Sequence, residues 1–411
     1  MITSAADEIR VADVDSHISE PEDLWLSRLP RKWHELAPQV SVDPGTGLRR
    51  WRIGDAWMFP VGIYAHAGWH EFAPGCPPAL EEADPATWNP VARLARMDEY
   101  GIDVQVLYPN VMGFELLAFS EHPDQELALA CVSAYNDFQT EFAATAPDRL
   151  IPITAVPFWN LDAALREIER NAARGHRGIL WANKFENAHL PSFTEKHWDP
   201  VYSLAAEADL SVNFHVGFSR NTRSHQEGAA RIDALGHIFG SSRGTRENPP
   251  LFESAVRTVQ FSLTTLLGNA PTILELITSD LPIRYPQLKF VSVESGFGYI
   301  PYLMEAVDWQ WSNSGARDAR PDRPLPSEVF KKQCYGSFWF EHKTIPMLQH
   351  YQDNFMFETD FPHPTAMAPG HGSYALVPSQ KIQESLVSQL PPEVLRKVLW
   401  DNAAKLYRLD R

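Results

Sequence analysis

Short apolar segments alternate along the chain with longer segments that carry apolar residues at helical spacing. Eight short runs, each bounded by turn residues, have the length of buried β-strands. They cover residues 9–14, 104–108, 150–156, 178–181, 210–215, 288–293, 336–340 and 354–357. Amphipathic patterns between them predict helices at residues 91–100, 125–145, 161–174, 200–208 and 299–309. This alternation predicts βα units arranged around a parallel sheet.

Eight such strands are the number that closes a (β/α)8 barrel, so the predicted fold is an α/β TIM barrel. A doubly wound open sheet would show the same alternation. The nucleotide-binding form of that sheet has a G-x-G-x-x-G or P-loop sequence after its first strand, and neither follows residues 9–14. The barrel is therefore the favoured interpretation.

Two segments depart from the barrel pattern. Residues 33–75 contain Pro, Gly and several Trp, and the alternating stretch 48–59 predicts a β-hairpin beside the first βα unit. Residues 220–284 form a long insertion after the fifth strand, polar at first and helical in pattern over 251–277. Such segments are typical of lids, of dimer contacts or of ordinary barrel decoration. Because no linker or repeat is found, residues 1–411 are predicted to form one domain.

Charge narrows the list of partners. The 411 residues include 52 Asp and Glu against 36 Lys and Arg, which gives a formal net charge of −16. Nucleic acids and anionic membranes are bound through an excess of Lys and Arg, so neither is the expected partner. A small organic acid can still be bound in a local basic pocket, and we expect a small-molecule substrate.

The cysteines and the first residues bear on location. Cys76, Cys131 and Cys334 are scattered and form no C-x-x-C motif, which argues against a disulfide framework. The first ten residues lack the apolar core of a secretory signal, and no uncharged apolar run is long enough to cross a bilayer. We therefore expect a cytoplasmic protein.

Carboxylate and imidazole side chains stand at the ends of four predicted strands. Asp15 and His17 end the first strand two residues apart, a spacing that places both on one face of a strand. The fifth, sixth and eighth strands end in His215, Glu294, Asp360 and, just beyond, His363. In a TIM barrel these positions meet at the C-terminal mouth, where such enzymes carry out their chemistry.

Imidazole and carboxylate ligands around one point are typical of a site for Zn²⁺, Mn²⁺ or Fe²⁺. A single Asp or His at a strand end more commonly caps a turn. Four such positions, each at the end of a separate strand, are not expected by chance, and they favour a shared divalent metal site.

The same strand ends carry motifs that resemble the amidohydrolase superfamily. They read Asp13-Val-Asp-Ser-His-Ile-Ser-Glu-Pro21, Asn213-Phe-His-Val-Gly217 and Glu358-Thr-Asp-Phe-Pro-His363. The connecting sequences Ala146-Pro-Asp-Arg-Leu150, Trp198-Asp-Pro-Val-Tyr202 and Asp401-Asn-Ala-Ala-Lys-Leu-Tyr407 resemble it too. The branch resembled includes aminocarboxymuconate-semialdehyde decarboxylase and the resorcylate and carboxyvanillate decarboxylases. The resemblance covers nearly the whole chain apart from the two insertions.

The resemblance implies a TIM barrel with one divalent metal, and we expect Zn²⁺ ahead of Mn²⁺ or Fe²⁺. His17, His215 and Asp360 match the family's ligand positions, and Asp15 stands where members carry His or Glu. Glu294 is a departure, because the decarboxylases usually have His there. It could act as a ligand, as a base or as an orienting residue.

The resemblance favours a non-oxidative decarboxylase of an aromatic or unsaturated carboxylic acid, in which Asp360 mediates proton transfer. The alternative is metal-assisted hydrolysis of an amide, ester, lactone or activated C–C bond. Asp360 or Glu294 would then take the proton of water and His363 would polarise the scissile group. A hydratase is a variant of this alternative. A non-catalytic barrel is a third interpretation, and the retained ligand set argues against it.

Two further expectations concern the insertions. Arg220 and Arg223, just past the fifth strand, are candidate anchors for the substrate carboxylate, although they could equally be solvated residues. The aromatic and apolar surplus of both insertions predicts a homodimer, or a dimer of dimers, because a monomer would have to leave it exposed.

Overall fold

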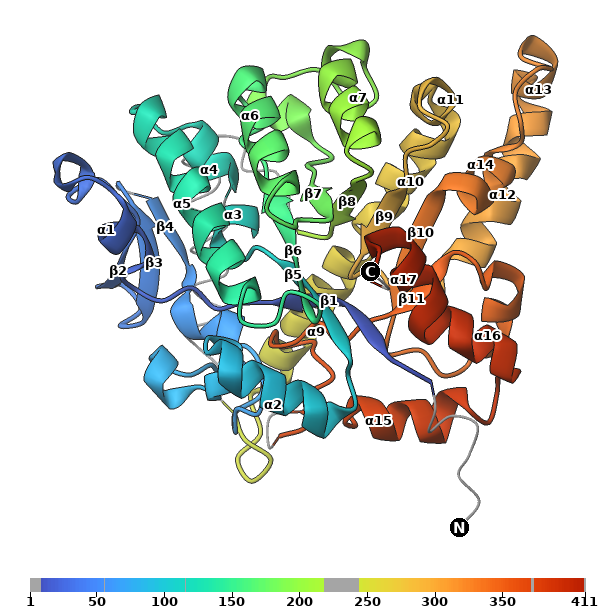
Figure 1. Ribbon diagram of the computed structural model, residues 1–411. Helices are drawn as coiled ribbons and strands as arrows, with labels where there is room; N and C mark the ends of the chain where they lie inside the picture. Colours follow the sequence, from blue (N-terminus) through green and yellow to red (C-terminus); the bar gives the residue numbers. More distant parts are fainter. Residues whose placement is uncertain (1–8, 55, 115, 218–243, 371–372, 410–411) are drawn as a thin grey trace.

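The computed structural model describes residues 9–54, 56–114, 116–217, 244–370 and 373–409. Within them, eight strands form one sheet in the order β1-β5-β6-β7-β8-β9-β10-β11, and every neighbouring pair is parallel (Figure 1). The strands are β1 Ala12–His17, β5 Val104–Tyr108, β6 Leu150–Ala155, β7 Gly178–Leu180, β8 Ser211–His215, β9 Phe290–Val293, β10 Cys334–Phe338 and β11 Phe355–Phe357.

Each strand falls on one predicted apolar run, and β1 shows the largest shift. It begins at Ala12 and ends at His17, where the strand end was predicted, whereas the apolar run covers residues 9–14. The polar residues Asp15, Ser16 and His17 belong to the strand although they are not apolar. All three are buried, and Ser16 and His17 pair with β5.

The first and last strands meet at a seam that lacks a regular ladder. The backbone N–H of His17 donates to the carbonyl oxygen of Phe361 at 2.7 Å, and that of Asp360 donates to the carbonyl oxygen of Asp15 at 2.9 Å. Ser16 and Phe361 form a single parallel bridge. These bonds bring the sheet close to full closure, and the predicted (β/α)8 TIM barrel is confirmed.

Helices surround the strands (Figure 1). The longer ones are α2 Pro90–Tyr100, α5 Gln125–Ala143, α6 Leu161–Ala172, α7 Asp199–Glu207, α9 Phe252–Leu266, α10 Asn269–Thr278, α12 Ile300–Asn313 and α14 Pro326–Gln333. Short helices are α1 Leu24–Arg28, α3 Val111–Phe114, α4 Leu116–Ser120, α11 Leu281–Arg284, α13 Ala316–Ala319, α15 Pro378–Lys381, α16 Pro392–Arg396 and α17 Asn402–Tyr407.

Local sequence explains where the helices begin and end. The side chain of Asn89 caps α2 by accepting from two backbone N–H groups, and Pro90 occupies the first turn. The helix ends at Gly101, whose φ of 72° suits glycine. Asp124 and Asn160 cap α5 and α6 in the same way, so all three helices start at residues that the sequence marks.

The C-terminal helix α17 packs against the interior of the barrel. Tyr407 is fully buried in the same apolar cluster as Val14, Val106 and Val293 from three strands. Its hydroxyl donates to Asn213 Oδ1 at 3.4 Å. The barrel interior is therefore filled, and space for a ligand has to lie at the mouth.

Two elements stand outside the barrel plan. A small antiparallel sheet in the order β2-β3-β4 lies to one side of the barrel, at the left of Figure 1. Its strands are β2 Gln39–Val42, β3 Arg49–Ile53 and β4 Ala56–Pro60, and the last two occupy the stretch predicted as a hairpin. Helices α9 and α10 occupy the stretch 251–277 that was predicted to be helical. Residues 220–243 of that predicted insertion lie outside the described residues.

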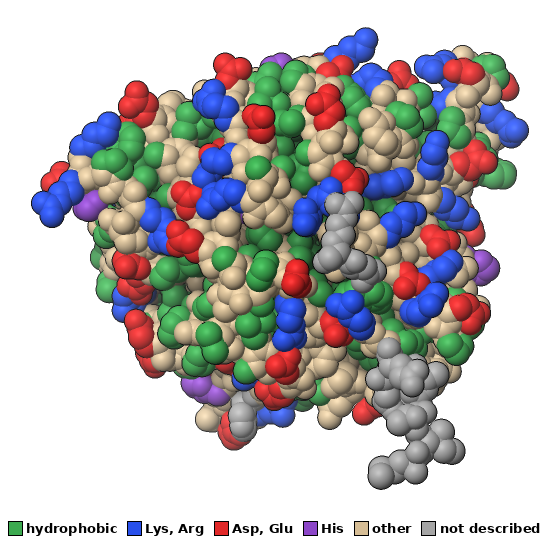
Figure 2. All heavy atoms as spheres, viewed as in Figure 1, with side chains coloured by type: hydrophobic (Ala, Val, Ile, Leu, Met, Phe, Trp, Pro, Cys, Tyr) green, Lys and Arg blue, Asp and Glu red, His purple; other side chains and the backbone are tan. Residues whose placement is uncertain are grey.

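Charged side chains of both signs share the surface. On the face in Figure 2, Lys and Arg side chains are interspersed with Asp and Glu. Among the described helices, none has the length and apolar character needed to cross a bilayer.

Candidate metal centre

Four side chains from three strand ends converge in the mouth of the barrel. The Nε2 atoms of His17 and His215 lie 3.1 Å apart. Asp15 Oδ1 lies 3.4 Å from Nε2 of His17 and 3.5 Å from that of His215. Asp360 Oδ1 lies 3.6 Å from Nε2 of His17. All four side chains are buried, so their polar atoms face one another and not solvent.

Irregular backbone aims these groups into the mouth. The pairing of β1 with β5 shifts register between Asp13 and Ser16, a β-bulge that contains Asp15. Glu294 and Asp360 have φ angles of 56° and 54°, in the left-handed region that side chains other than glycine seldom adopt. Strained backbone of this kind concentrates at functional sites.

The two histidines direct their Nε2 atoms at the same point. Nδ1 of His17 lies 3.1 Å from the carbonyl oxygen of Tyr108, and Nδ1 of His215 lies 2.8 Å from that of Val216. Because a carbonyl oxygen only accepts, each Nδ1 carries the proton in the neutral ring and each Nε2 keeps its lone pair. Metal-binding histidines are commonly oriented by such a bond to a backbone carbonyl.

The carboxylates of Asp15 and Asp360 have fewer hydrogen-bond donors around them than their oxygens could accept. Both carboxylate oxygens of Asp15 and Oδ1 of Asp360 are buried and accept no hydrogen bond from the described residues. A buried anion without partners is costly, and a cation would satisfy these oxygens and the two imidazole nitrogens together. The donor set therefore fits one divalent metal ion.

The pKa values of Asp15, His215 and Asp360 also indicate that a positive charge is favoured at this site. Burial alone would raise the pKa of Asp15, but His215 and His17 outweigh it and hold this pKa below its ordinary value. Burial opposes a charge on His215, yet Asp15 and Glu294 raise its pKa to about 9. Burial and the Asp15 charge raise the pKa of Asp360 well above its ordinary value. A positive charge, proton or metal, is thus favoured at this point.

The His363 ring lies against Asp360. His363 Nε2 lies 2.7 Å from Oδ1 of Asn110, whose Nδ2 donates to the carbonyl oxygen of Ile18. The Asn110 oxygen therefore faces His363, and Nε2 must donate. The other nitrogen, Nδ1, lies 2.8 Å from Asp360 Oδ1, close enough for a proton to pass between the two groups. The ring also stacks on His17, with centroids 3.9 Å apart.

Glu294 lies beside this pair. Its Oε2 is 3.7 Å from Nδ1 of His215, and its Oε1 accepts from the Thr365 hydroxyl at 3.3 Å. The same hydroxyl donates to Asp360 Oδ2. Thr365 thus connects Glu294, which follows β9, to Asp360, which follows β11.

The structure brings together the predicted site residues that it describes. These are Asp15, His17, His215, Glu294, Asp360 and His363. Arg220 and Arg223 lie outside the described residues. Sequence reasoning missed Asn110 and Thr365, which orient the predicted residues. Asn110 follows the end of β5 by two residues, a position that the strand-end pattern could have indicated.

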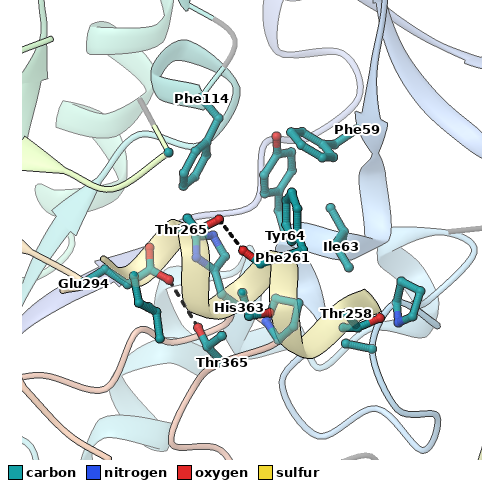
Figure 3. A pocket seen from close by; sticks show the side chains of 16 residues that line it. Phe59, Ile63, Tyr64, Phe114, Thr258, Phe261, Thr265, Glu294, His363 and Thr365 are labelled. Carbon is teal, nitrogen blue, oxygen red and sulfur yellow. Dashed lines mark hydrogen bonds between the residues drawn. The ribbon is translucent and has the colours of Figure 1, made fainter. Parts of the chain in front are cut away.

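A pocket opens above the cluster (Figure 3). Its cavity volume is about 150 Å³, and it is open to solvent. Glu294, His363 and Thr365 line it, and aromatic and aliphatic side chains make up much of its wall (Figure 3). The apolar part comes from the segment around β4, from α3 and from α9: Phe59, Ile63, Tyr64, Phe114, Phe261 and Leu266. Helix α9 runs along this wall in Figure 3.

Comparison with known proteins gives results that agree with the family resemblance of the strand-end motifs. A family model described as amidohydrolase matches residues 14–409. A gamma-resorcylate decarboxylase of Polaromonas sp. (strain JS666 / ATCC BAA-500) is 24% identical over 330 residues, covering 78% of this chain and 87% of that protein.

Solved structures are similar along their whole length. An amidohydrolase from Mycobacterium avium subsp. paratuberculosis K-10 has a TM-score of 0.66 at 22% identity, covering 97% of this chain and 99% of that one. A 5-carboxyvanillate decarboxylase mutant from Novosphingobium aromaticivorans DSM 12444, with bound manganese and 3-methoxy-4-hydroxy-5-nitrobenzoic acid, has a TM-score of 0.63 at 17% identity, covering 99% of each chain. At these identities the likeness concerns the fold.

Proposed function

The chain belongs to the amidohydrolase family, as its strand-end motifs predicted, and from this premise we propose that it is a metal-dependent decarboxylase of an aromatic or unsaturated carboxylic acid. The observation that carries the proposal is a buried cluster of imidazoles and carboxylates at the base of a pocket walled by aromatic side chains. The relatives named as decarboxylases of resorcylate and carboxyvanillate support it.

Asp15, His17, His215 and Asp360 would hold one divalent cation. Bound there, it supplies an electrophile for the carboxylate or a neighbouring oxygen of the substrate. We propose Zn²⁺, although the donor set also suits Mn²⁺, the metal bound in the related carboxyvanillate decarboxylase structure.

Proton transfer falls to Asp360 and His363. Replacement of a ring carboxyl group by hydrogen requires a proton at the ring carbon. Asp360 Oδ1 and His363 Nδ1 lie 2.8 Å apart, next to the pocket that His363 lines, so a proton can pass between them to the substrate. The apolar wall would hold the ring of the substrate and exclude water around it.

A cationic anchor for the substrate is a separate proposal. Among the described residues that line the pocket, none is Lys or Arg. We propose that Arg220 or Arg223, which follow the pocket residue Gly217 in sequence, binds a substrate acidic group.

Glu294 favours the second candidate function, metal-assisted hydrolysis. A carboxylate in the pocket, 3.7 Å from His215, is suited to take a proton from an attacking water. The two functions differ in their products. Decarboxylation releases carbon dioxide and removes one carboxyl group, whereas hydrolysis adds water and releases no carbon dioxide.

The test is to incubate the Zn²⁺- or Mn²⁺-loaded protein with hydroxybenzoic acids and with a matched set of aryl esters and lactones. Carbon dioxide and ring product are then measured by mass spectrometry. We expect carbon dioxide from at least one acid, lost when the metal is removed by chelation. Turnover of esters alone would reject the decarboxylase and support the hydrolase.

We also propose a cytoplasmic homodimer. Helix α9 exposes apolar side chains on the face opposite the pocket, with Phe252, Val259 and Leu263 exposed by 76%, 64% and 54%. No Asp, Glu, Lys or Arg occurs in residues 258–274. In a chain with a net charge of −16, this uncharged stretch is where two copies could approach with the least repulsion.

A further inference from the structure

Buried polar side chains lie one layer outside the candidate ligands, at the seam between β1 and β11. Asp13 lies two residues before Asp15 on β1 and has no exposed surface. Its Oδ1 accepts from the backbone N–H of Thr359 at 2.8 Å, and its Oδ2 from the Thr359 hydroxyl at 2.5 Å. Thr359 directly precedes Asp360. One carboxylate therefore joins the strand that carries Asp15 and His17 to the residue beside Asp360.

Gln105 and Arg93 approach Asp13 from the other side. Gln105 Nε2 donates to Asp13 Oδ2 at 2.8 Å, and its Oε1 accepts from Arg93 Nη1 at 3.1 Å. Arg93 also donates to the carbonyl oxygens of His17 and Ala86, each at 2.6 Å. Because Arg93 can only donate, it fixes the Gln105 amide with the nitrogen toward Asp13. The order of donors and acceptors is thus determined along the whole chain of contacts.

The seam between β1 and β11 has less backbone pairing than the other strand junctions of the barrel. Every other neighbouring pair in the barrel has three or four paired residues. Between β1 and β11 the bridge Ser16–Phe361 stands alone among the described residues. Side chains therefore carry a larger share of the closure here, at the one junction whose two strands both supply candidate ligands.

We propose that Asp13, Gln105 and Arg93 are positioning residues that set the separation of β1 and β11, and with it the spacing of the metal ligands. A metal site loses affinity when its ligands move by about 0.5 Å, so the seam has to be held closely. The proposal rests on the proposed metal site but not on the reaction, and it is tested through metal binding.

The first variant is Asp13→Asn, which keeps the size of the side chain. The new amide group has to face either Thr359 or Gln105, and both donate to Asp13 in the wild type. Gln105 cannot turn to accept, because its oxygen would leave Arg93. Mn²⁺ is titrated into the metal-free full-length protein, and free Mn²⁺ is measured by electron paramagnetic resonance. We expect affinity to fall about 10–100-fold, the usual effect of losing a group that orients metal ligands.

The matched control is Glu167→Gln on α6. Glu167 is also a buried carboxylate, and it accepts from Ser133 Oγ at 2.6 Å and from Asn136 Nδ2 at 2.9 Å. It joins α5 to α6, away from the seam. We expect this variant to lower the melting temperature of the metal-free protein and to leave Mn²⁺ affinity unchanged.

A rescue variant separates positioning from general damage. Asp13→Asn combined with Gln105→Glu restores alternating donors and acceptors, because the introduced amide and Arg93 both donate to the introduced carboxylate while the amide oxygen accepts from Thr359. We expect most of the Mn²⁺ affinity to return. Wild-type affinity in Asp13→Asn, or no recovery in the double variant, would overturn the proposal. If Asp13→Asn does not fold, Thr359→Val removes one bond of the seam, and unchanged Mn²⁺ affinity there would overturn it equally.

Discussion

At the scale of single residues, the site depends on which atom carries each proton. Carbonyl oxygens at Tyr108 and Val216 leave both Nε2 atoms available, and Asn110 forces His363 to present Nδ1 to Asp360. Neighbours that carry no charge thus decide what the titratable groups can do. Two side chains, His215 and Glu294, allow this to be tested directly.

Replacing His215 by Ala should remove the metal. The imidazole supplies one of two nitrogens that lie 3.1 Å apart, and the remaining carboxylates would not compensate for its loss. Elemental analysis should show far less than one metal per chain. His176→Ala is the control, because His176 is buried between the hydroxyls of Thr140 and Thr154, away from the mouth, and the variant should keep its metal. Full metal content in the His215 variant would contradict the assignment.

Replacing Glu294 by Gln should abolish turnover or release the metal. The side chain lines the pocket, lies close to His215 and adopts a left-handed backbone that an orienting role alone would not require. A neutral amide of the same shape is a poor ligand and no base. Metal content and kcat are measured together. Wild-type metal with near-normal turnover would show that Glu294 only orients its neighbours.

At the scale of elements, α9 has two faces in different surroundings. One face lines the pocket through Thr258, Phe261 and Thr265, and the other exposes Val259 and Leu263. The helix has little buried surface of its own, since Ser254 is its only buried residue within Phe252–Leu266. Its position should therefore depend on what occupies the pocket and on what covers the opposite face.

Phe261→Ala should weaken binding of an aromatic ligand about tenfold, which corresponds to about 1.4 kcal/mol for the lost ring contact. The matched variant Leu263→Ala, on the exposed face of α9, should leave binding within about twofold. Equilibrium titration of the metal-loaded protein with 2-nitroresorcinol measures both, since this compound is the inhibitor bound in a solved structure of a dihydroxybenzoic acid decarboxylase from Polaromonas sp. JS666. Equal effects from the two variants would mean that the pocket face does not contact the ligand.

At the scale of the whole molecule, the proposed dimer should depend on the exposed face of α9. Leu263→Glu places a charge in the uncharged stretch 258–274 and should shift the protein to monomer in light scattering at micromolar concentration. Tyr302→Glu, on the exposed surface of α12, is the control and should leave the oligomeric state unchanged. A wild-type protein that is monomeric at all concentrations would reject the dimer.

Much of the molecule could be predicted because its signals are local. A run such as residues 104–108 is apolar throughout most of its length, and it forms β5 with the same bounds because a strand inside a barrel is buried on both sides. Asn89, Asp124 and Asn160 mark helix starts for equally local reasons. Asp15, His17, His215, Glu294 and Asp360 were identifiable because polar residues at the ends of apolar strands stand out. The single domain stays a prediction.

Only the tertiary structure could decide how these groups meet. Asp13 bonds to Thr359 across 346 positions of sequence, and Asn110 reaches His363 across 253. No spacing rule predicts such pairs, because they arise only when β11 returns beside β1 and the barrel closes. The same holds for the pocket, whose wall combines side chains near β4 with others on α9. The sequence by itself determined which residues end the strands, since that depends on near neighbours. Barrel closure decided their protonation, their spacing and the space above them, since these depend on contacts between distant segments.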